Sequence, residues 1–438
     1  MTIYPYMGGR GSPYSWERHI GRVFDDEDDA NLAEVRMQRY NIIGLDESDS
    51  SDNEENGYDT SSFDKILPSE HTYLGDDMEE RRGRTVWEDN SLQAVTLLPP
   101  PSIVLVPGQV LPLSVDDQYT IRMLEYCIQE RDGVFGVMVK WPVRYGELSD
   151  PDYVGTTAEI YEYSKGEVEA GVTRSMTIKA KARQRFKAYE LGKTGSGHFY
   201  QAKIRILPEV VLKDALYHIC PHINRCLSSK SDRFRKRGAI TTRWPLWVYD
   251  QYHAPKLVER VQKLKYIKQG KDVTLPKNPT ALSFWVAQNL PHKQRLMTLK
   301  LNSPIQRLRW ELSVLERMHT YQCSHCNITV GSKRDVIIMS VDGPQSTYVN
   351  PNGYLHETLT LSQTINVKLN GEPSTQFSWF PGYAWITAFC AHCRSHMGWK
   401  FVAQKNDLQP KKFWGLSRRS LQMKIVPGEY NEDSVYVM

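Results

Sequence analysis

The sequence lacks the long apolar run that a membrane-spanning helix requires. Its most apolar stretch, residues 102–115, is interrupted by Pro107, Gly108 and Pro112, whereas a span needs about 20 apolar residues in a row. The N-terminal residues MTIYPYMGGRGSPYSW also lack a cationic segment followed by an apolar run, so we expect no secretory signal. These absences predict a cytoplasmic and nuclear protein without a membrane anchor.

Cysteine is scarce, with seven residues among 438. Four of the seven form two Cys-x-x-Cys pairs, a pattern that favours a metal site over a disulfide framework. The hydrophobic content of 40% is sufficient for two or three domains with cores of their own.

Charge is unevenly distributed along the chain. The first 65 residues carry 6 Lys and Arg against 15 Asp and Glu, a net charge of −9, so the remainder carries +13. The most basic run comprises Lys230, Arg233, Arg235, Lys236 and Arg237. This run contains one aromatic residue, Phe234, and no stacking motif, so a solvated loop is favoured over nucleic-acid binding.

Residues 1–65 contain the acidic, serine-rich runs DDEDDA and DESDSSDNEEN. Their low apolar content cannot offset the entropy cost of ordering, which predicts a disordered acidic tail. The serines could be phosphorylated, or the runs could simply keep the tail solvated. A second, short tail is expected at 427–438.

Two folded segments of different character follow the tail. Residues 91–209 contain β-branched runs between Pro and Gly turns, such as VTLLPPPSIVLVPGQVLPLSV, GTTAEIYEY and YQAKIRILPE, which predict a β-rich unit. Residues 210–317 place apolar residues three and four positions apart, which predicts helices. Pro304 opens the clearest helix, whose apolar stripe is Ile305, Leu308, Leu312 and Leu315.

A separate all-β domain is expected at 318–426. Strand-like segments DVIIMSVD, ETLTLSQTINVKLNG and WKFVAQ are separated there by the turns DGPQ, NPNG and FPGY. The fold class predicted for the whole chain is therefore mixed and β-rich.

Both Cys-x-x-Cys pairs lie in this third segment, with 63 residues between them. Cys323, Cys326, Cys390 and Cys393 would complete the tetrahedral set that a structural Zn²⁺ prefers, with no open position for water. His325 and His392 lie inside the pairs and could compete as ligands. A coincidental spacing or a redox pair is the alternative interpretation.

A second group of ligand-type residues comprises His218, Cys220, His222 and Cys226. Its spacing fits no common zinc pattern, and Pro221 interrupts it. Packing of the two cysteines in a core is the favoured interpretation.

The most informative stretch is FSWFPGYAW at residues 377–385, followed by MGWKF at 397–401. It places Trp379, Trp385, Trp399 and Phe401 close in sequence to the second cysteine pair. Aromatic side chains set on Pro and Gly turns can wall a small box for a flat or cationic group. An ordinary aromatic core explains the spacing equally well.

These residues carry a resemblance to the cereblon family. YVNPNGYLHETLT, STQFSWFPGYAW, the cysteine pairs, GWKF and KFWGL are similar to that family in order. SEHTYLGDDMEE, VPGQVLPL, GTTAEIY, ARQRFK and ILPE resemble its Lon-type N-terminal domain. The resemblance spans about residues 66–426 and includes long, rare motifs.

The resemblance implies a non-catalytic substrate receptor of a cullin-RING E3 ubiquitin ligase. Residues 91–317 would be a Lon N-terminal-like domain, whose helical part, 210–317, docks on the β-propeller adaptor of the ligase. Residues 318–426 would be the thalidomide-binding CULT domain, a β-tent with one structural Zn²⁺. The targets would be small-molecule imides and proteins that end in a cyclised Gln or Asn.

By matching motif, Trp379, Trp385 and Trp399 would be cage walls, and Phe401 would close the floor. A glutarimide or similar cyclic imide would lie between the rings, because its faces are apolar, and main-chain groups at Phe377 and Trp379 would bind its polar edge. The other expected ligand-binding residues are Ser378, Asn350 and His356.

The chain departs from the family pattern around the cage. Phe377 stands where vertebrate members carry histidine, and Gln376 replaces an acidic neighbour. Asn352 also stands where a histidine is familiar, and Thr387 occupies a rim position that tunes which targets a drug recruits. Main-chain contacts to an imide would survive these changes, whereas contacts of the lost imidazole would not.

Two enzymatic functions lack necessary parts. A Lon protease needs an ATPase module, but Lys187 stands where the Walker loop would require glycine, five residues before Gly192. A methionine sulfoxide reductase, which has a similar two-knuckle fold, needs a reactive thiol beyond the four zinc ligands. The alternative function is an aromatic-cage reader of methylated lysine, or of another small group, without a ligase role. A cage for a cation often adds a carboxylate, for which Glu372 and Glu357 are the nearest candidates, whereas an imide reader needs none.

Overall fold

The structure is a computed structural model. It describes residues 63–425 except 76, 101–102, 142–144, 151, 167, 170–171, 196, 212–235, 237–238, 241 and 265–273. All of these residues belong to one unit of the chain. Residues 1–62, the short tail at 427–438, the His218 to Cys226 cluster and most of the basic run around Lys230 lie outside the described residues.

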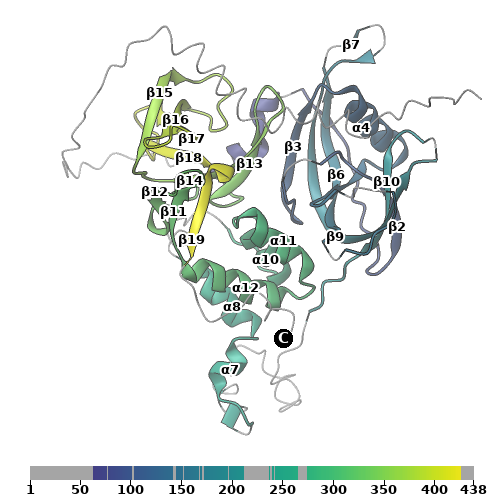
Figure 1. The fold of residues 1–438 in the computed structure, drawn as a ribbon, viewed down its shortest axis with the longest axis horizontal. Coiled ribbons are helices and arrows are strands. Elements are labelled where there is room, and N and C mark those ends of the chain that lie inside the picture. The colour runs from purple at the N-terminus through teal and green to yellow at the C-terminus, as the bar shows by residue number, and fades with distance from the viewer. Residues whose placement is uncertain are drawn as a thin grey trace, which may run out of the picture. The chain divides into compact units, whose positions relative to one another are not determined.

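An eight-stranded antiparallel sheet forms the first folded region (Figure 1). Its strands are β1 (Glu79–Glu80), β2 (Leu92–Thr96), β3 (Val110–Val115), β4 (Val134–Met138), β5 (Gly146–Glu147), β6 (Val154–Lys165), β9 (Met176–Lys193) and β10 (Tyr200–Ile206). The main path runs β1-β6-β9-β10-β2, while β3 and β5 pair with β9 and β4 pairs with β6. A separate hairpin joins β7 (Val168–Glu169) to β8 (Val172–Thr173).

The core of this sheet is mainly aliphatic and closed. In β9, side chains such as Ile178, Ala180 and Ala182 alternate toward the interior, as a half-buried strand requires. Helix α4 (Gln118–Glu130) packs Leu124 into the same core, and Asp117 caps its first turn by accepting a hydrogen bond from the Thr120 N–H at 2.8 Å. The predicted β-rich unit is therefore confirmed.

One predicted strand-like run does not join the sheet. Residues 103–106 are fully buried, yet they form no strand in the described structure. Side chains take the place of a partner strand, since the Thr156 hydroxyl donates to Leu105 O at 2.7 Å and the Arg295 guanidinium donates to Val104 O at 3.2 Å. The surrounding prolines, which cannot donate to a ladder, explain why this buried run stays unpaired.

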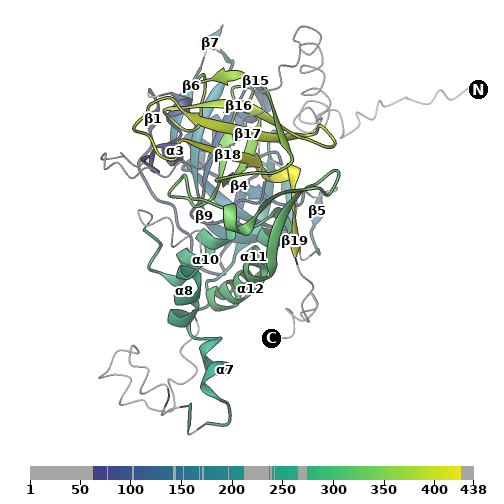
Figure 2. The ribbon, with the colours of Figure 1, turned by 90° about the vertical axis from the view of Figure 1, so that its left-hand side faces the viewer.

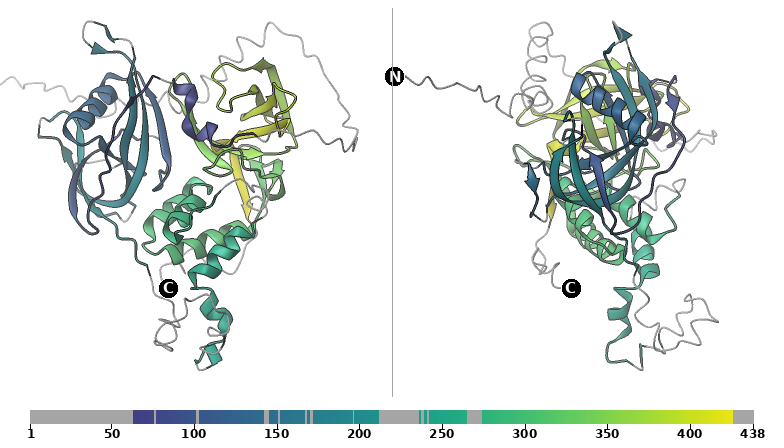
Figure 3. Two further views of the ribbon diagram at one scale, coloured as in Figure 1. Left: turned by 180° about the vertical axis from the view of Figure 1, so that it is seen from behind. Right: turned by 90° about the vertical axis from the view of Figure 1, so that its right-hand side faces the viewer.

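Helices follow the sheet, as the sequence predicts (Figure 3). They are α7 (Leu246–Asp250), α8 (Ala254–Gln262), α10 (Pro279–Ala287), α11 (His292–Lys300) and α12 (Pro304–Arg317). The stripe of Ile305, Leu308, Leu312 and Leu315 is buried, which confirms the helix expected from Pro304. No helix in the described ranges has the length and apolar character to cross a membrane.

Two antiparallel sheets form the C-terminal region. The smaller has the order β12-β11-β19, with β11 (Met318–Cys323), β12 (Thr329–Ser332) and β19 (Leu421–Ile425). The larger has the order β13-β14-β18-β17-β16-β15, and Figure 2 shows its last four strands side by side. Its strands are β13 (Gln345–Val349), β14 (Leu355–Leu361), β15 (Val367–Ser374), β16 (Tyr383–Cys390), β17 (His396–Ala403) and β18 (Lys412–Ser417).

The first described residues pack on this C-terminal region. Phe63, which we expected to be part of the disordered tail, is buried, and its ring lies edge-on to Tyr383 at 5.3 Å. The Val341 N–H donates to Lys65 O at 3.0 Å. The expectation for residues 63–65 is therefore wrong, because an apolar ring at the end of an acidic run finds a partner far along the chain. Helix α3 (Leu67–Glu70) and the turn η2 (Thr72–Leu74) continue this segment.

Candidate functional site

The two cysteine pairs fold into matched turns. Cys323 ends β11 and Cys390 ends β16. In each pair, the first cysteine's C=O accepts a hydrogen bond from the N–H of the residue after the pair: Asn327 at 2.9 Å and Arg394 at 3.0 Å. Both of these residues have positive φ, 62° and 61°, which closes a tight turn. The sequence thus builds two equivalent knuckles at the ends of distant strands.

The four sulfur atoms fit a metal ion. All lie within 4.8 Å of one another, and Cys323 Sγ is 3.6 Å from Cys393 Sγ, as Cys326 Sγ is from Cys390 Sγ. Zn–S bonds of about 2.3 Å in a tetrahedron would separate sulfurs by about 3.8 Å. The neighbouring His325 and His392 are exposed and lie outside this group. The structure therefore brings together all four predicted ligands.

One face of the larger sheet gathers the predicted cage residues. Strand pairing places Trp385 opposite Phe401 and Thr387 opposite Trp399 across β16 and β17. Residues paired across neighbouring strands, or two apart on one strand, share a face. Trp385, Trp399 and Phe401 therefore stand on the same side of the sheet.

Trp379 comes to this face from the turn before β16. Its ring lies edge-on to Trp399, with centroids 4.8 Å apart at 77°, and stacks on Tyr348 at 5.0 Å. His356 of β14 contacts both indoles, at 5.5 Å from Trp379 and 5.1 Å from Trp399. These contacts make one continuous aromatic wall.

Two of the indole N–H groups are already bound within the protein. Trp385 Nε1–H donates to Gln376 O at 2.9 Å, and Trp379 Nε1–H donates to Val349 O at 3.2 Å. Both bonds fix the orientation of a ring. Since the indole donors are engaged, these walls can offer a ligand only their apolar surfaces.

The turn before Trp379 holds its shape through its own hydrogen bonds. The Ser378 N–H donates to Thr375 O at 3.3 Å, and the Ser378 hydroxyl donates to Phe380 O at 3.1 Å. Phe377 adopts φ of +53°, a conformation that bulky residues rarely take. The main-chain N–H and C=O groups of Phe377 and Trp379 are not among the hydrogen bonds that the described residues make. The turn therefore presents main-chain donors and acceptors beside the aromatic wall.

Asn350 and Phe401 are structural in this arrangement. Asn350 Oδ1 accepts hydrogen bonds from the N–H groups of Asn352 at 3.1 Å and Tyr354 at 2.8 Å, which shapes the tip of the β13–β14 hairpin. Phe401 is buried, with its ring 4.8 Å from Phe380 in an edge-on contact. It supports the cage face from the aromatic core.

The imidazole of His356, which contacts two of the cage indoles, is uncharged. Burial, with smaller contributions from His396 and Arg419, lowers the pKa of His356 to about 3, so its imidazole is neutral. Glu357 points to the other side of β14 from His356. Its carboxylate is buried and accepts a hydrogen bond from buried Arg295. Glu357, one of the two acids predicted as candidates for a cationic cage, is thus engaged elsewhere, which removes one candidate counter-charge for a cationic ligand.

Sequence reasoning missed two aromatic residues at this site. Tyr348 pairs with His356 across the hairpin and stacks on Trp379, and the NPNG turn between these two residues was an available signal of the hairpin. Tyr73 lies much earlier in the chain, and its hydroxyl accepts a hydrogen bond from the Val349 N–H at 3.1 Å. No local pattern predicts that second contact.

Comparisons with known families cover both folded regions. Residues 94–317 match the family described as ATP-dependent protease La (LON) substrate-binding domain. Residues 319–434 match the family described as Yippee zinc-binding/DNA-binding/Mis18, centromere assembly. The second description names zinc binding, which agrees with the geometry of the four cysteines. This description and that geometry together support a zinc-binding cysteine cluster in the C-terminal region.

Comparisons with individual proteins extend over most of the chain. Protein cereblon of Gallus gallus is 41% identical over 392 residues, covering 84% of this chain and 86% of the relative. The Danio rerio protein is 40% identical over 394 residues, covering 84% and 89%. Protein cereblon of Drosophila melanogaster is 32% identical and covers 82% and 62%. With this identity across both regions and the cage motifs in place, the chain belongs to the cereblon family.

Proposed function

We propose that this protein is a non-catalytic substrate receptor of a cullin-RING E3 ubiquitin ligase, which holds cyclic imides in a cage of Trp379, Trp385 and Trp399. The observation that carries the proposal is the pairing of aromatic walls with a turn whose main-chain groups at Phe377 and Trp379 have no hydrogen-bond partner among the described residues. An imide ring needs both, since its faces are apolar and its edge presents two carbonyls and an N–H.

The cage would bind its ligand without a chemical reaction. Fixed indoles enclose the ring by contact, and the preorganised turn meets the polar edge at little cost in entropy. A methylated lysine would bring a positive charge to a face where the neutral His356 and the engaged Glu357 offer no counter-charge. We therefore favour an uncharged imide as the ligand over a cation.

The cysteine cluster serves the cage from a distance. One structural Zn²⁺ held by Cys323, Cys326, Cys390 and Cys393 ties the end of β11 to the β16–β17 turn, and β16 and β17 carry Trp385 and Trp399. With four sulfur ligands, this site has no open position for a substrate. Its role is to hold the two cage strands in register.

A separate surface suits the ligase adaptor. Trp244 and Trp247, at and just before α7, are 56% and 65% exposed, and Ile240 is 82% exposed. Exposed tryptophans grouped on one short segment are typical of a protein interface. The proposed division is a Lon-like domain at 91–317, whose helical part docks on the β-propeller adaptor, and a ligand-binding domain at 318–426. The proposed location is the cytoplasm and the nucleus.

Reconstituted ubiquitination tests this function. The full chain, loaded with zinc, is combined with adaptor, cullin and RING subunits and with a reporter protein that ends in a cyclised glutamine. We expect modification of this reporter and little of an identical reporter ending in linear glutamine. Trp385→Ala should abolish the difference, and Trp244→Ala with Trp247→Ala should remove adaptor binding while imide binding persists. Equal modification of the two reporters by the unaltered protein would refute the proposal.

A further inference from the structure

Phe377 is an anomaly that cage binding leaves unexplained. Its side chain is 53% exposed, and its φ of +53° lies in the left-handed region, which disfavours bulky residues. The main chain alone would serve an imide equally well with glycine at this position. A costly conformation that also leaves an aromatic ring in water points to a ligand that the ring contacts.

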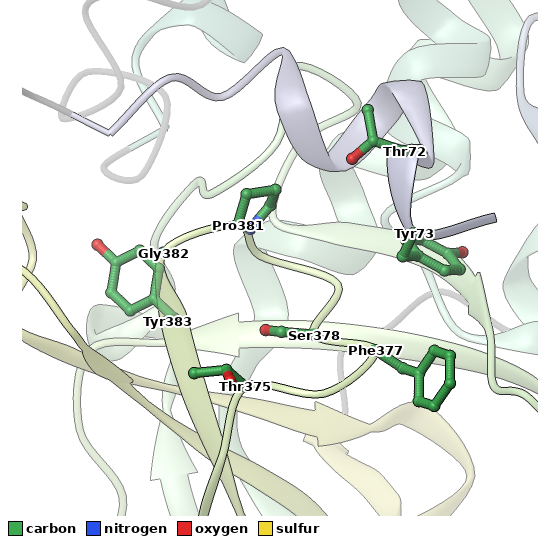
Figure 4. A pocket seen from close by; sticks show the side chains of 8 residues that line it. All are labelled: Thr72, Tyr73, Thr375, Phe377, Ser378, Pro381, Gly382 and Tyr383. Atoms are coloured by element: carbon green, nitrogen blue, oxygen red, sulfur yellow. The ribbon is translucent and has the colours of Figure 1, made fainter. Parts of the chain in front are cut away.

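A pocket begins at this ring (Figure 4). It has a volume of about 390 Å³, within the range of small-molecule sites. Phe377, Ser378 and Pro381 line one side, and Thr72 and Tyr73 of the N-terminal segment line another. Tyr73 is held in place because its hydroxyl accepts a hydrogen bond from the Val349 N–H. None of the residues that line the pocket is charged.

One turn contributes residues to both the pocket and the cage. Phe377 and Ser378 line the pocket, and the same turn carries Trp379 and bonds to the indole of Trp385 through Gln376 O. In a protein that ends in a cyclised glutamine, the polypeptide leaves the ring from the carbon next to one imide carbonyl. If the turn binds that carbonyl, the preceding residue must leave the cage beside Phe377.

We infer that this pocket receives the side chain of the residue before the cyclic imide, and that Phe377 makes the receptor prefer uncharged, apolar side chains there. The inference rests on the proposed function and adds a specificity to it. The ring of Phe377 supplies apolar contact area, while the hydroxyls of Thr72 and Ser378 suit a main-chain amide. A charged side chain would lose water without meeting an opposite charge in this lining.

Competition binding with the full, zinc-loaded chain tests the inference. The probe is a fluorescent glutarimide without a peptide, and the competitors are short peptides that end in cyclised glutamine preceded by Leu, Phe, Gly, Asp or Lys. We expect the Leu and Phe peptides to bind about tenfold more tightly than the Gly and Asp peptides. Phe377→Gly should reduce this ratio to about twofold or less, because glycine keeps the turn and removes only the ring. The readout is the ratio between peptides, in which any change of imide affinity common to all peptides cancels.

Two further variants guard against a disturbed turn. Asparagine also tolerates positive φ, so Phe377→Asn should keep the turn. Like Phe377→Gly, it should lose the preference for peptides with an apolar residue before the imide. Thr72→Lys, on the opposite side of the pocket, should improve binding of the Asp peptide relative to the Leu peptide. A preference that survives both Phe377 substitutions would overturn the inference, as would a Thr72→Lys variant whose ratio of Asp-peptide to Leu-peptide affinity is unchanged.

The outcomes for the unaltered protein separate the two proposals. If it binds the probe but all five peptides equally, the pocket inference fails and the proposed function stands. If it does not bind the probe, the proposed function fails and the inference fails with it.

Discussion

The two large sheets of this protein differ in the side chains that they bury and in the faces that they leave open. The eight-stranded sheet closes around aliphatic side chains such as Ile178 and Leu124, which burial alone can hold. The six-stranded sheet leaves Trp385 and Trp399 only partly buried on one face, where their contact area is available to a ligand. Partly buried indoles contribute less to the stability of the C-terminal region than fully buried side chains contribute to the first sheet. We therefore expect the C-terminal region to depend on cross-links that the first sheet does not need.

The zinc site is the strongest of these cross-links. Cys390→Ser should release the metal and destabilise the C-terminal region severely, because structural zinc contributes on the order of 10 kcal/mol in small domains. Hydrogen exchange should show lost protection in β13–β18, while β6 and β9 retain theirs. Cys127→Ala, a buried cysteine in the aliphatic core, is the matched control and should leave zinc content unchanged. Equal loss of protection in both sheets would refute the prediction that only the C-terminal region depends on the zinc site.

The buried ion pair between Arg295 of α11 and Glu357 of β14 is the second cross-link. Arg295→Met should lower the free energy of unfolding by about 3–5 kcal/mol, because it leaves a buried carboxylate without its partner. Arg295 also donates to Leu290 O at 2.8 Å, so part of the loss comes from that carbonyl.

Denaturant unfolding of a double-mutant cycle checks this prediction. Replacing both charges, Arg295→Met with Glu357→Met, should recover at least half of the loss, since no unpaired charge remains buried. Additive losses in the double variant would mean that the two side chains do not act as a pair.

Contact between the β13–β14 hairpin and β3 has a smaller expected effect. A Cβ on Gly353 would lie 2.6 Å from Ser114 O. Gly353→Ala should cost roughly 1–3 kcal/mol from its strained φ and this collision together. Gly371→Ala is a close control, because its φ of +89° resembles the +81° of Gly353 but nothing lies within 4 Å. Thermal unfolding should show a larger loss for Gly353→Ala, and equal losses would contradict the contact.

Acid should weaken the packing of the N-terminal segment. Burial, together with the charges of Lys179 and Lys181, lowers the pKa of His71 from 6.5 to about 3. Protons therefore bind the unfolded chain preferentially, so this stability is present above pH 6.5 and declines as the pH falls toward 3. The slope is at most about 1.4 kcal/mol per pH unit. His71→Asn, which tolerates the φ of 51°, should flatten the pH profile of unfolding between 6.5 and 4; an unchanged profile would argue against the neutral imidazole.

Local patterns predicted much of the fold. The α12 stripe from Ile305 to Leu315 has the period of a helix with one buried face, and the structure buries that face. The spacing of Trp399 and Phe401, two residues apart, places both rings on one side of a strand without reference to any partner. Each cysteine knuckle likewise takes its geometry from five consecutive residues, the Cys-x-x-Cys pair and the residue that follows it.

Contacts between distant segments could not be predicted in this way. Phe63 packs on Tyr383, and Arg295 pairs with Glu357, yet neither partner leaves a periodic signal near the other. Residues 103–106 resemble a strand in composition, but side chains from elsewhere satisfy their carbonyls. The positive φ of Phe377 was also hidden, because residues 373–381 contain no glycine that would mark such a turn.

Titration of the full, zinc-loaded protein with a fluorescent glutarimide tests the central claim most directly. The proposed cage predicts saturable binding that Trp385→Ala or Trp399→Ala weakens at least about tenfold, as expected for aromatic anchors that the ligand covers. Trp285→Phe, at a buried tryptophan of the helical core away from the cage, should bind as the unaltered protein does. No saturable binding by the folded, zinc-loaded protein, or equal binding by the Trp385→Ala variant, would contradict the cage.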